Sequence, residues 1–131
     1  MPASADIEPE VIYAYTRQRA LADGVLVDAS VLAKEAGFLW PVALTERLYH
    51  SYVVPELNLV AEGQSSEGRL WDLVFVLRFA IAKARNTDTI LFKVLFLMSA
   101  CSSPVPIDLK AICGPGDDGE PVLTIMLPDE D

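Results

Sequence analysis

The sequence is poor in the residues that build most metal and catalytic sites. Its 131 residues include two cysteines and one histidine. They provide at most three zinc ligands without the C-x₂-C spacing, so a zinc site is disfavoured. An imidazole catalyst needs an orienting partner, and it would have to be built around His50 alone. We therefore interpret His50 as part of a half-buried aromatic helix face and both cysteines as free thiols, and we expect no cofactor.

Long apolar runs are also missing. The longest, Leu70 to Ala82, is interrupted by Asp72 and Arg78 and is shorter than the roughly 20 residues that cross a bilayer. The N-terminal residues show no cationic, apolar, small-residue signal, and two cysteines do not make a secreted disulfide scaffold. The sequence therefore predicts a protein of the reducing cytoplasm with no membrane contact.

Positive charge is scarce, which limits the partners. The chain has 10 Lys and Arg against 19 Asp and Glu, a formal net charge of −9. Residues 1–16 hold three acids and no base, residues 108–131 hold seven acids and one base, and the charges between them balance. The one basic cluster, Lys83 with Arg85, lies where a helix is expected to end and suits the helix dipole. Phosphate contacts need clustered Lys and Arg, so direct nucleic-acid binding is disfavoured.

Apolar residues are plentiful and predict a folded core. They make up 52% of the chain, which excludes general disorder, and the length fits one domain. Residues 1–10, rich in proline and acid, are predicted to form a flexible acidic leader. Residues 11–131 are predicted to form a single globular domain.

Periodicity and turn residues predict an α+β fold. The predicted helices lie at 17–23, from Asp28 or Ser30 to 36, at 46–53 and at 69–85. The predicted strands lie at 11–15, 25–27, 90–98, 107–113 and 122–127. The polar stretch 61–68 is predicted to be a surface loop, and 114–121 a long hairpin turn. We therefore expect a mainly helical N-terminal two-thirds that packs on a C-terminal antiparallel sheet of about three strands.

The predicted helix over 69–85 is apolar on two sides. At about 100° per residue, its broader face consists of Leu70, Leu73, Val74, Leu77 and Ile81. Its second apolar face consists of Trp71, Phe75, Phe79 and Ala82. Such a helix is either the central helix of the domain or contributes one side to a subunit interface. Arg69 and Asp72, three residues apart, are interpreted as an internal ion pair.

Aromatic residues are the first candidates for partner binding. Trp40, Tyr49, Tyr52 and Trp71 could form a patch that stacks on a flat ligand or on a partner's side chains, although aromatic residues at helical spacing more often belong to the core. Phe38–Pro41 is the part most expected to be exposed, because Pro41 prevents a regular helix there.

The acidic loop GPGDDGEP, residues 114–121, is the second candidate. Its carboxylates Asp117, Asp118 and Glu120 could gather Ca²⁺ or Mg²⁺, or contact a basic partner. The ligand order of an EF-hand and the G-K-[ST] of a phosphate loop are both absent. A solvated hairpin turn explains the same composition without any ligand, and we expect no metal there.

Four stretches of the sequence carry a family resemblance. IYAYTRQRALADGVLVDAS, AKEAGFLWPVALTERL, GRLWDL and LKAICGPGDDGEPVLTIMLP resemble a family of small uncharacterised bacterial proteins that are often carried on plasmids, phages and other mobile elements. The resemblance spans residues 12–128. It implies a bacterial cytoplasmic protein, accessory to a mobile element, and assigns no catalytic residue or cofactor.

Three functions remain compatible with these patterns. The first is a small acidic, non-enzymatic protein that binds a protein partner, as an accessory or host-interaction factor of a mobile element. The second is a metal-dependent binder or small enzyme that uses the loop 114–121. The third is a structural protein that self-associates as a homo-oligomer through the second apolar helix face. The absence of an assembled acid, base and nucleophile favours the first.

Overall fold

A computed structural model describes residues 15–61, 63–84, 87–99 and 103–130. The expected leader at 1–10 lies outside these ranges, as do residues 11–14 of the expected strand at 11–15. The described helices are α2 (Arg17–Asp23), α3 (Ser30–Glu35), α4 (Glu46–Leu48), the π-helix η1 (Tyr49–Val53), α5 (Leu57–Val60) and α6 (Ser66–Lys83). The described strands are β2 (Leu26–Asp28), β3 (Val42–Thr45), β4 (Thr89–Phe96), β5 (Val105–Pro115) and β6 (Pro121–Met126).

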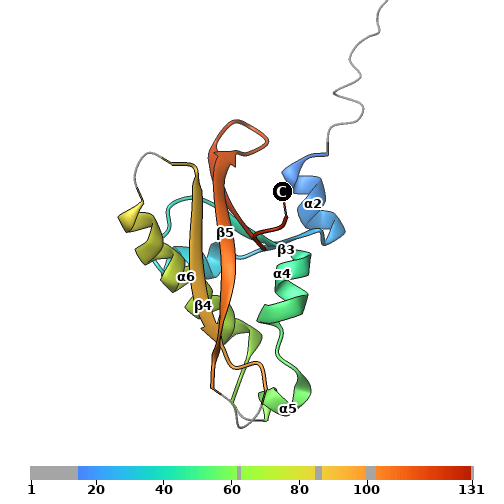
Figure 1. Cartoon of the computed structure of the whole chain (residues 1–131). Coiled ribbons are helices and arrows are strands. Elements are labelled where there is room, and N and C mark those ends of the chain that lie inside the picture. Colours follow the sequence, from blue (N-terminus) through green and yellow to red (C-terminus); the bar gives the residue numbers. More distant parts are fainter. Residues whose placement is uncertain (1–14, 62, 85–86, 100–102, 131) are drawn as a thin grey trace, which may run out of the picture.

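The described strands form one five-stranded mixed sheet in the order β2-β3-β6-β5-β4 (Figure 1). β4, β5 and β6 pair antiparallel in sequence order, and β2 pairs antiparallel with β3. β3 and β6 pair in parallel, with Val42 opposite Leu123 and Leu44 opposite Ile125. The predicted mainly helical N-terminal part on a three-stranded antiparallel sheet is therefore wrong, because β2 and β3 join the C-terminal strands in one sheet.

The missed strand β3 has no periodic signature. Val42, Ala43 and Leu44 are all buried, so both faces of the strand are covered and its side chains do not alternate between apolar and polar. The strand has four residues and follows Pro41, whose carbonyl accepts the N–H of Leu123 at 2.9 Å. Its pairing depends on residues about 80 positions away in the chain, which no local pattern reveals.

Neighbouring residues mark the ends of the first two helices, although the N-cap of α3 is Ala29, whose side chain makes no capping bond. Thr16 Oγ1 accepts the N–H of Arg19 at 3.0 Å, and Gly24 ends α2 with a φ of 81°. At the start of α3, Asp28 Oδ1 accepts the N–H of Ser30 at 3.1 Å and its hydroxyl at 2.6 Å. Gly37 follows α3 with a φ of 104°. These ends need only neighbouring residues, which is why the sequence predicts them.

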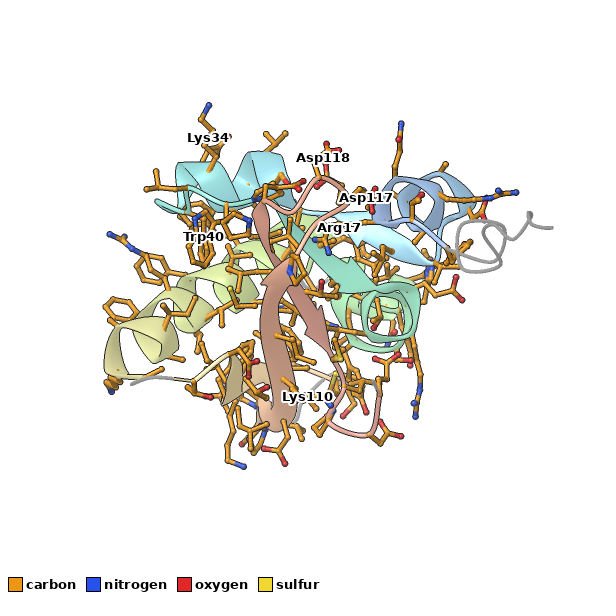
Figure 2. The ribbon with its side chains drawn as sticks, turned by 90° about the horizontal axis from the view of Figure 1, so that it is seen from above. Arg17, Lys34, Trp40, Lys110, Asp117 and Asp118 are labelled. Atoms are coloured by element: carbon orange, nitrogen blue, oxygen red, sulfur yellow. The ribbon has the colours of Figure 1, made fainter. Side chains whose placement is uncertain are left out.

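Helices lie on both faces of the sheet. In Figures 1 and 2, α6 and α2 lie on opposite sides of it. The main core forms between the sheet and α6, where Leu73, Val74 and Leu77 are fully buried. On the opposite face, Arg17 of α2 donates from its guanidinium to Thr124 Oγ1 at 2.7 Å and to the carbonyl of Leu123 at 2.9 Å. This arrangement leaves the outer side of α6 facing away from the sheet.

The segments around α6 differ from the prediction in extent. α6 starts at Ser66, where Ser65 Oγ accepts the N–H of Gly68 at 3.0 Å, so the predicted loop at 61–68 is shorter than expected. The predicted helix at 46–53 is helical throughout, but its second half, η1, is a π-helix.

In the described ranges, no helix is both long and apolar enough to cross a membrane.

Arg69 of α6 is the one charged residue buried in the described part of the chain, with 3% of its surface exposed. Its guanidinium donates to the carbonyls of Tyr52, at 2.7 Å, and Leu97, and its Nε donates to Gln64 Oε1 at 3.1 Å. Its Cζ lies 5.4 Å from the ring centroid of Phe96. Burial lowers the pKa of this guanidinium.

These contacts give Arg69 a different role from the predicted one. Asp72 is exposed and is not a partner of Arg69, so the predicted internal ion pair is wrong. The arginine instead connects η1, the segment before α6 and the residue after β4 through hydrogen bonds to neutral groups.

Candidate functional site

The outer side of α6 carries three aromatic rings in contact. Trp71, Phe75 and Phe79 are spaced by four residues and therefore follow one another along one side of the helix. The ring centroids of Trp71 and Phe75 are 6.0 Å apart with the planes 20° from parallel. Those of Phe75 and Phe79 are 5.2 Å apart at 81°, an edge-to-face contact. We call these three residues the aromatic ridge.

Two of the three residues of the aromatic ridge are exposed, and Trp71 is half-buried against the core. Phe75 is 40% exposed and Phe79 is 56% exposed, whereas Leu73 and Leu77 on the sheet side have no exposed surface. A helix that is apolar on two sides is normally covered on both. The exposed fractions show that the rest of the described chain covers only one side of α6. A contiguous exposed apolar surface of this kind is typical of protein interaction sites.

The apolar surface continues from the ridge into the loop between α3 and β3. Leu39 is 96% exposed and Trp40 is 44% exposed. Together with Arg78 and Ile81 of α6, both line a hollow of about 250 Å³, and Figure 2 shows Trp40 beside α6. The loop approaches α6 closely at Gly37, where a Cβ atom would lie 3.1 Å from Cζ of Arg78. Glycine therefore lets the Arg78 guanidinium lie against the loop.

A second hollow lies on the other side of the ridge, between α6 and β4. It has a volume of about 420 Å³, and Val76, Phe79, Lys83 and Leu91 contribute to its lining. β4 is an edge strand of the sheet. The exposed apolar surface thus extends from Leu39, across the aromatic ridge, to the edge of the sheet.

Of the predicted aromatic candidates, Trp40 and Trp71 belong to this surface. Tyr49 and Tyr52 are half-buried and pack against the core. Tyr49 lines a separate hollow of about 370 Å³ with Glu67 and other residues. His50 is exposed, and its ring lies edge-on to Tyr49 with the centroids 5.3 Å apart. The four predicted aromatic residues therefore do not form one patch.

The acidic loop has structural contacts of its own. Asp117 accepts the backbone N–H of Arg17 at 2.8 Å through Oδ1 and that of Gln18 at 2.9 Å through Oδ2. Figure 2 shows Asp117 next to Arg17. These N–H groups begin α2 and have no acceptor within that helix, so the carboxylate caps its N-terminus. The bonds from Gln18 and Arg17 lower the pKa of Asp117.

The other two acids of the loop do not converge with Asp117 on a metal site. Glu120 Oε1 accepts the N–H of Asp118 at 3.0 Å, and its carboxylate folds over Gly116, where a Cβ would lie 2.5 Å from it. Asp118 is exposed. In residues 15–61, 63–84, 87–99 and 103–130, no three His, Cys, Asp or Glu side chains are grouped so that they could hold a metal ion.

We expect the Asp117 cap to make stability pH-dependent. The pKa of Asp117 is lower in the folded state than in the unfolded chain. The cap therefore contributes fully to the free energy of unfolding above the ordinary aspartate pKa of about 3.9, and this contribution is lost as the pH falls through the folded-state pKa. Asp117→Ala should therefore be less stable than the wild type in urea unfolding at pH 7, and the difference should shrink below about pH 4. Asp118→Ala is the matched control and should change little. A difference that stays constant with pH would contradict the capping role.

Acids near the C-terminus also form intramolecular contacts. Glu130 Oε2 accepts the hydroxyl of Thr45 at 2.7 Å and the N–H of Leu127 at 2.8 Å. Asp129 forms an ion pair of 3.1 Å with Arg47. Part of the acidic excess in residues 108–131 therefore holds the last residues of the described chain against α4 and its N-cap, Thr45.

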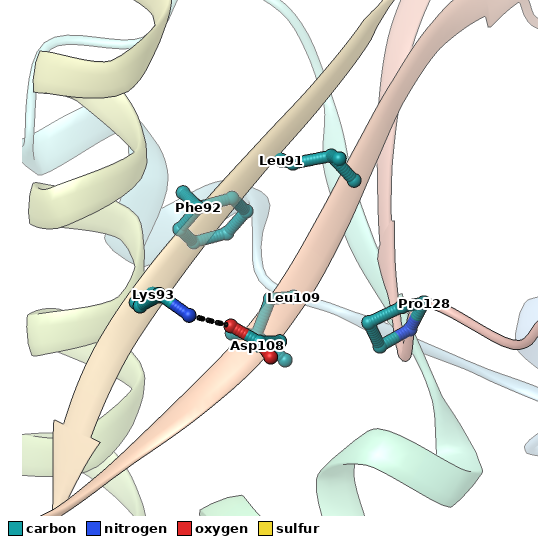
Figure 3. A pocket seen from close by; sticks show the side chains of 6 residues that line it. All are labelled: Leu91, Phe92, Lys93, Asp108, Leu109 and Pro128. Atoms are coloured by element: carbon teal, nitrogen blue, oxygen red, sulfur yellow. Dashed lines mark hydrogen bonds and ion pairs between the residues drawn. The ribbon is translucent and has the colours of Figure 1, made fainter.

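The open sheet face over β4 and β5 is a further candidate surface. Figure 3 shows its hollow, about 340 Å³, which is lined by Leu91, Phe92, Lys93, Asp108, Leu109 and Pro128. Lys93 Nζ and Asp108 Oδ1 lie 2.5 Å apart and neutralise each other's charge. An apolar floor and an internally paired charge supply no free polar group to orient a ligand. The aromatic ridge is the stronger candidate.

The fold and these surfaces define a small α+β protein on a five-stranded mixed sheet, with an exposed aromatic ridge on its long helix. The chain belongs to the family of unknown function DUF6573, whose model matches residues 6–131. The predicted resemblance to an uncharacterised family is confirmed to this extent. No curated protein and no solved structure matches the chain significantly.

The amino-acid sequence predicts that Trp71, Phe75 and Phe79 share the second apolar face of one helix, but of the three only Trp71 is a predicted binding residue. Helical spacing cannot tell which of two apolar faces remains exposed, because that depends on which face packs on the sheet. Leu39 was within the segment expected to be exposed, although Phe38 in the same segment is buried.

Proposed function

We propose that the protein is a non-enzymatic protein-interaction module, and that its contact surface is the aromatic ridge together with Leu39 and Trp40. The exposure of Phe75 and Phe79 on a helix that is apolar on both sides carries this proposal. Aromatic residues and arginine contribute most of the binding energy at protein interfaces. Arg78 lies between the ridge and Trp40, so both residue types are present here.

The disposition of the basic residues supports a protein partner. Several cations are already engaged within the chain. The engaged cations are Arg17, Arg47, Arg69, Lys93 and Lys110. A phosphate backbone would need clustered, unengaged Lys and Arg on one surface. An apolar surface with a few charges at its sides fits another protein better.

The setting that we propose is the bacterial cytoplasm, where the protein would serve as an accessory or host-interaction factor of a mobile element. The family resemblance of the four sequence stretches described above supports this setting.

Substitution of the ridge tests the proposal. The double variant Phe75→Ser, Phe79→Ser should retain the fold, because both side chains are exposed, and circular dichroism verifies this. In affinity capture from a lysate of bacteria that also express a second, differently tagged copy of the chain, we expect the wild type to retain a partner protein, this copy included, that the variant loses by about tenfold or more.

The matched control is Leu57→Ser, which removes a side chain that is 88% exposed on α5. It should capture as much partner as the wild type. Equal capture by the wild type and the ridge variant would refute the proposed surface, as would a wild type that retains nothing above the ridge variant.

A further inference from the structure

We infer that the aromatic ridge is an interface between two copies of this chain, in which the two α6 helices pack antiparallel about a twofold axis at Phe75. The inference rests on the proposed function, because it names the partner of the same surface. Its evidence is the arrangement of charged residues along both sides of the ridge.

Each side of the ridge carries one acid and one base. Glu67 and Arg78 lie along one side, and Asp72 and Lys83 lie along the other. The members of each pair are 11 residues apart, about three helical turns, so they share a side at different heights. On both sides, the acid is nearer the N-terminus of α6 and the base is nearer the C-terminus.

These four charges are free to meet a partner. All four side chains are on the exposed part of α6. In the described part of the chain, none of the four forms an ion pair or a side-chain hydrogen bond. Charged residues that border an apolar contact usually set its orientation and register rather than its strength.

Antiparallel packing pairs opposite charges on both sides of the interface. A twofold axis perpendicular to the helices brings each side of the ridge against the same side of the second copy. With the axis at Phe75, Glu67 of one copy lies about five residues along the axis from Arg78 of the other. Asp72 and Lys83 have the same offset. At 1.5 Å per residue this is about 7.5 Å, which the long side chains of arginine and lysine can span. The two copies of Asp72, and the two copies of Arg78, lie six residues apart, so two like-charge pairs oppose four opposite-charge pairs.

Parallel packing gives the opposite result. It brings one side of the ridge against the other side of the second copy. Glu67 would then lie near Asp72, and Arg78 near Lys83, with the same five-residue offset. Four like-charge pairs would then lie at this offset, and two opposite-charge pairs, each between Asp72 and Arg78, would lie six residues apart, so the arrangement is unfavourable in sum. The charge pattern therefore favours the antiparallel arrangement.

The apolar part of the interface is self-complementary in the same register. About an axis at Phe75, the two Phe75 rings face each other, and Trp71 of each copy faces Phe79 of the other. Burial of these rings supplies the attraction, and aromatic pairs add to it through edge-to-face and offset contacts. A shallow crossing angle of about 20°, common for long helices, keeps the rings in contact along the ridge.

Charge reversal with rescue tests the inference. Sedimentation velocity of the full-length chain from about 1 to 200 µM should show a monomer–dimer equilibrium. Asp72→Lys should raise the dimer dissociation constant about tenfold or more, because the reversed charge meets Lys83 of the other copy twice per dimer. Lys83→Glu should do the same. The double variant should return to within about threefold of the wild type.

Rescue cannot come from contacts within one chain. Positions 72 and 83 are about 16 Å apart along one helix, so they do not touch in the monomer. Arg19→Glu is the matched control: it reverses an exposed charge on α2, on the far side of the sheet, and should leave the dissociation constant unchanged. A wild type that stays monomeric over the whole range, or a double variant no tighter than the single variants, overturns the inference.

The two proposals fail separately. A monomeric wild type whose captured partner is lost with Phe75→Ser, Phe79→Ser overturns the dimer and keeps the interaction surface. A ridge variant that changes neither self-association nor capture overturns both. Loss of the dimer in the ridge variant, together with charge rescue, supports both.

Discussion

Arg69→Met is expected to lower the free energy of unfolding by about 3 to 5 kcal/mol, measured by urea denaturation followed by circular dichroism. The substitution removes the guanidinium that bonds the carbonyls of Tyr52 and Leu97 and the side chain of Gln64. A hydrogen bond to a charged donor contributes about 1.5 to 3 kcal/mol, and methionine keeps much of the apolar stem. The free energy of unfolding of Arg69→Lys should lie between those of the wild type and Arg69→Met, because an ammonium group cannot reproduce the planar set of donors of the guanidinium.

Arg19→Met is the matched control for this experiment. It makes the same exchange on α2, away from the aromatic ridge, at an exposed residue without an intramolecular ion pair in the described ranges. Its effect on the free energy of unfolding should stay within about 0.5 kcal/mol. Similar losses for the two variants would mean that Arg69 does not hold η1 and the end of β4 to α6.

Elements with local signals could be predicted from the sequence. Thr16 and Gly24 bound α2, and the glycine-rich turn between β5 and β6 joins an antiparallel pair as expected. α6 was predicted to within a few residues because its apolar period extends over about five turns. In each case the residues that decide the structure lie within the element or next to it.

The strand order could not be predicted, because it depends on contacts distant in sequence. β2 and β3 pair with each other, but β3 joins the C-terminal strands only through β6. A four-residue strand that is buried on both faces has the same apolar composition as a buried connecting segment between helices. Because β3 was not predicted, the predicted division into a helical part and a sheet part was wrong.

The roles of single side chains were obscured for the same reason. The bond from the N–H of Arg17 to Asp117 spans 100 residues, and the bond from Arg69 to the carbonyl of Leu97 spans 28. From the sequence, residues 114–121 are only an acidic loop, and Arg69 is a charged residue on an apolar helix. The nearest opposite charge, Asp72, is then the expected partner of Arg69. In the structure, backbone groups from other elements take that place, because buried backbone groups need partners.

Leu44→Ala is expected to lower the free energy of unfolding by about 2 to 5 kcal/mol. Leu44 has no exposed surface, and it lies on β3 between two neighbouring strands, opposite Val27 of β2 and Ile125 of β6. Removal of its side chain leaves a cavity in the main core between the sheet and α6, in addition to the loss of buried apolar surface. Urea denaturation measures the change.

Leu39→Ala is a control with the same exchange five residues earlier. Leu39 is 96% exposed, so its truncation should change the free energy of unfolding by no more than about 0.5 kcal/mol. The two leucines lie on either side of Pro41 in one short stretch of sequence, and the pairing of β3 with β2 and β6 makes them different. Equally small losses at both positions would contradict a buried strand at 42–45. A large loss at Leu44 alone would place this segment inside the sheet, between β2 and β6.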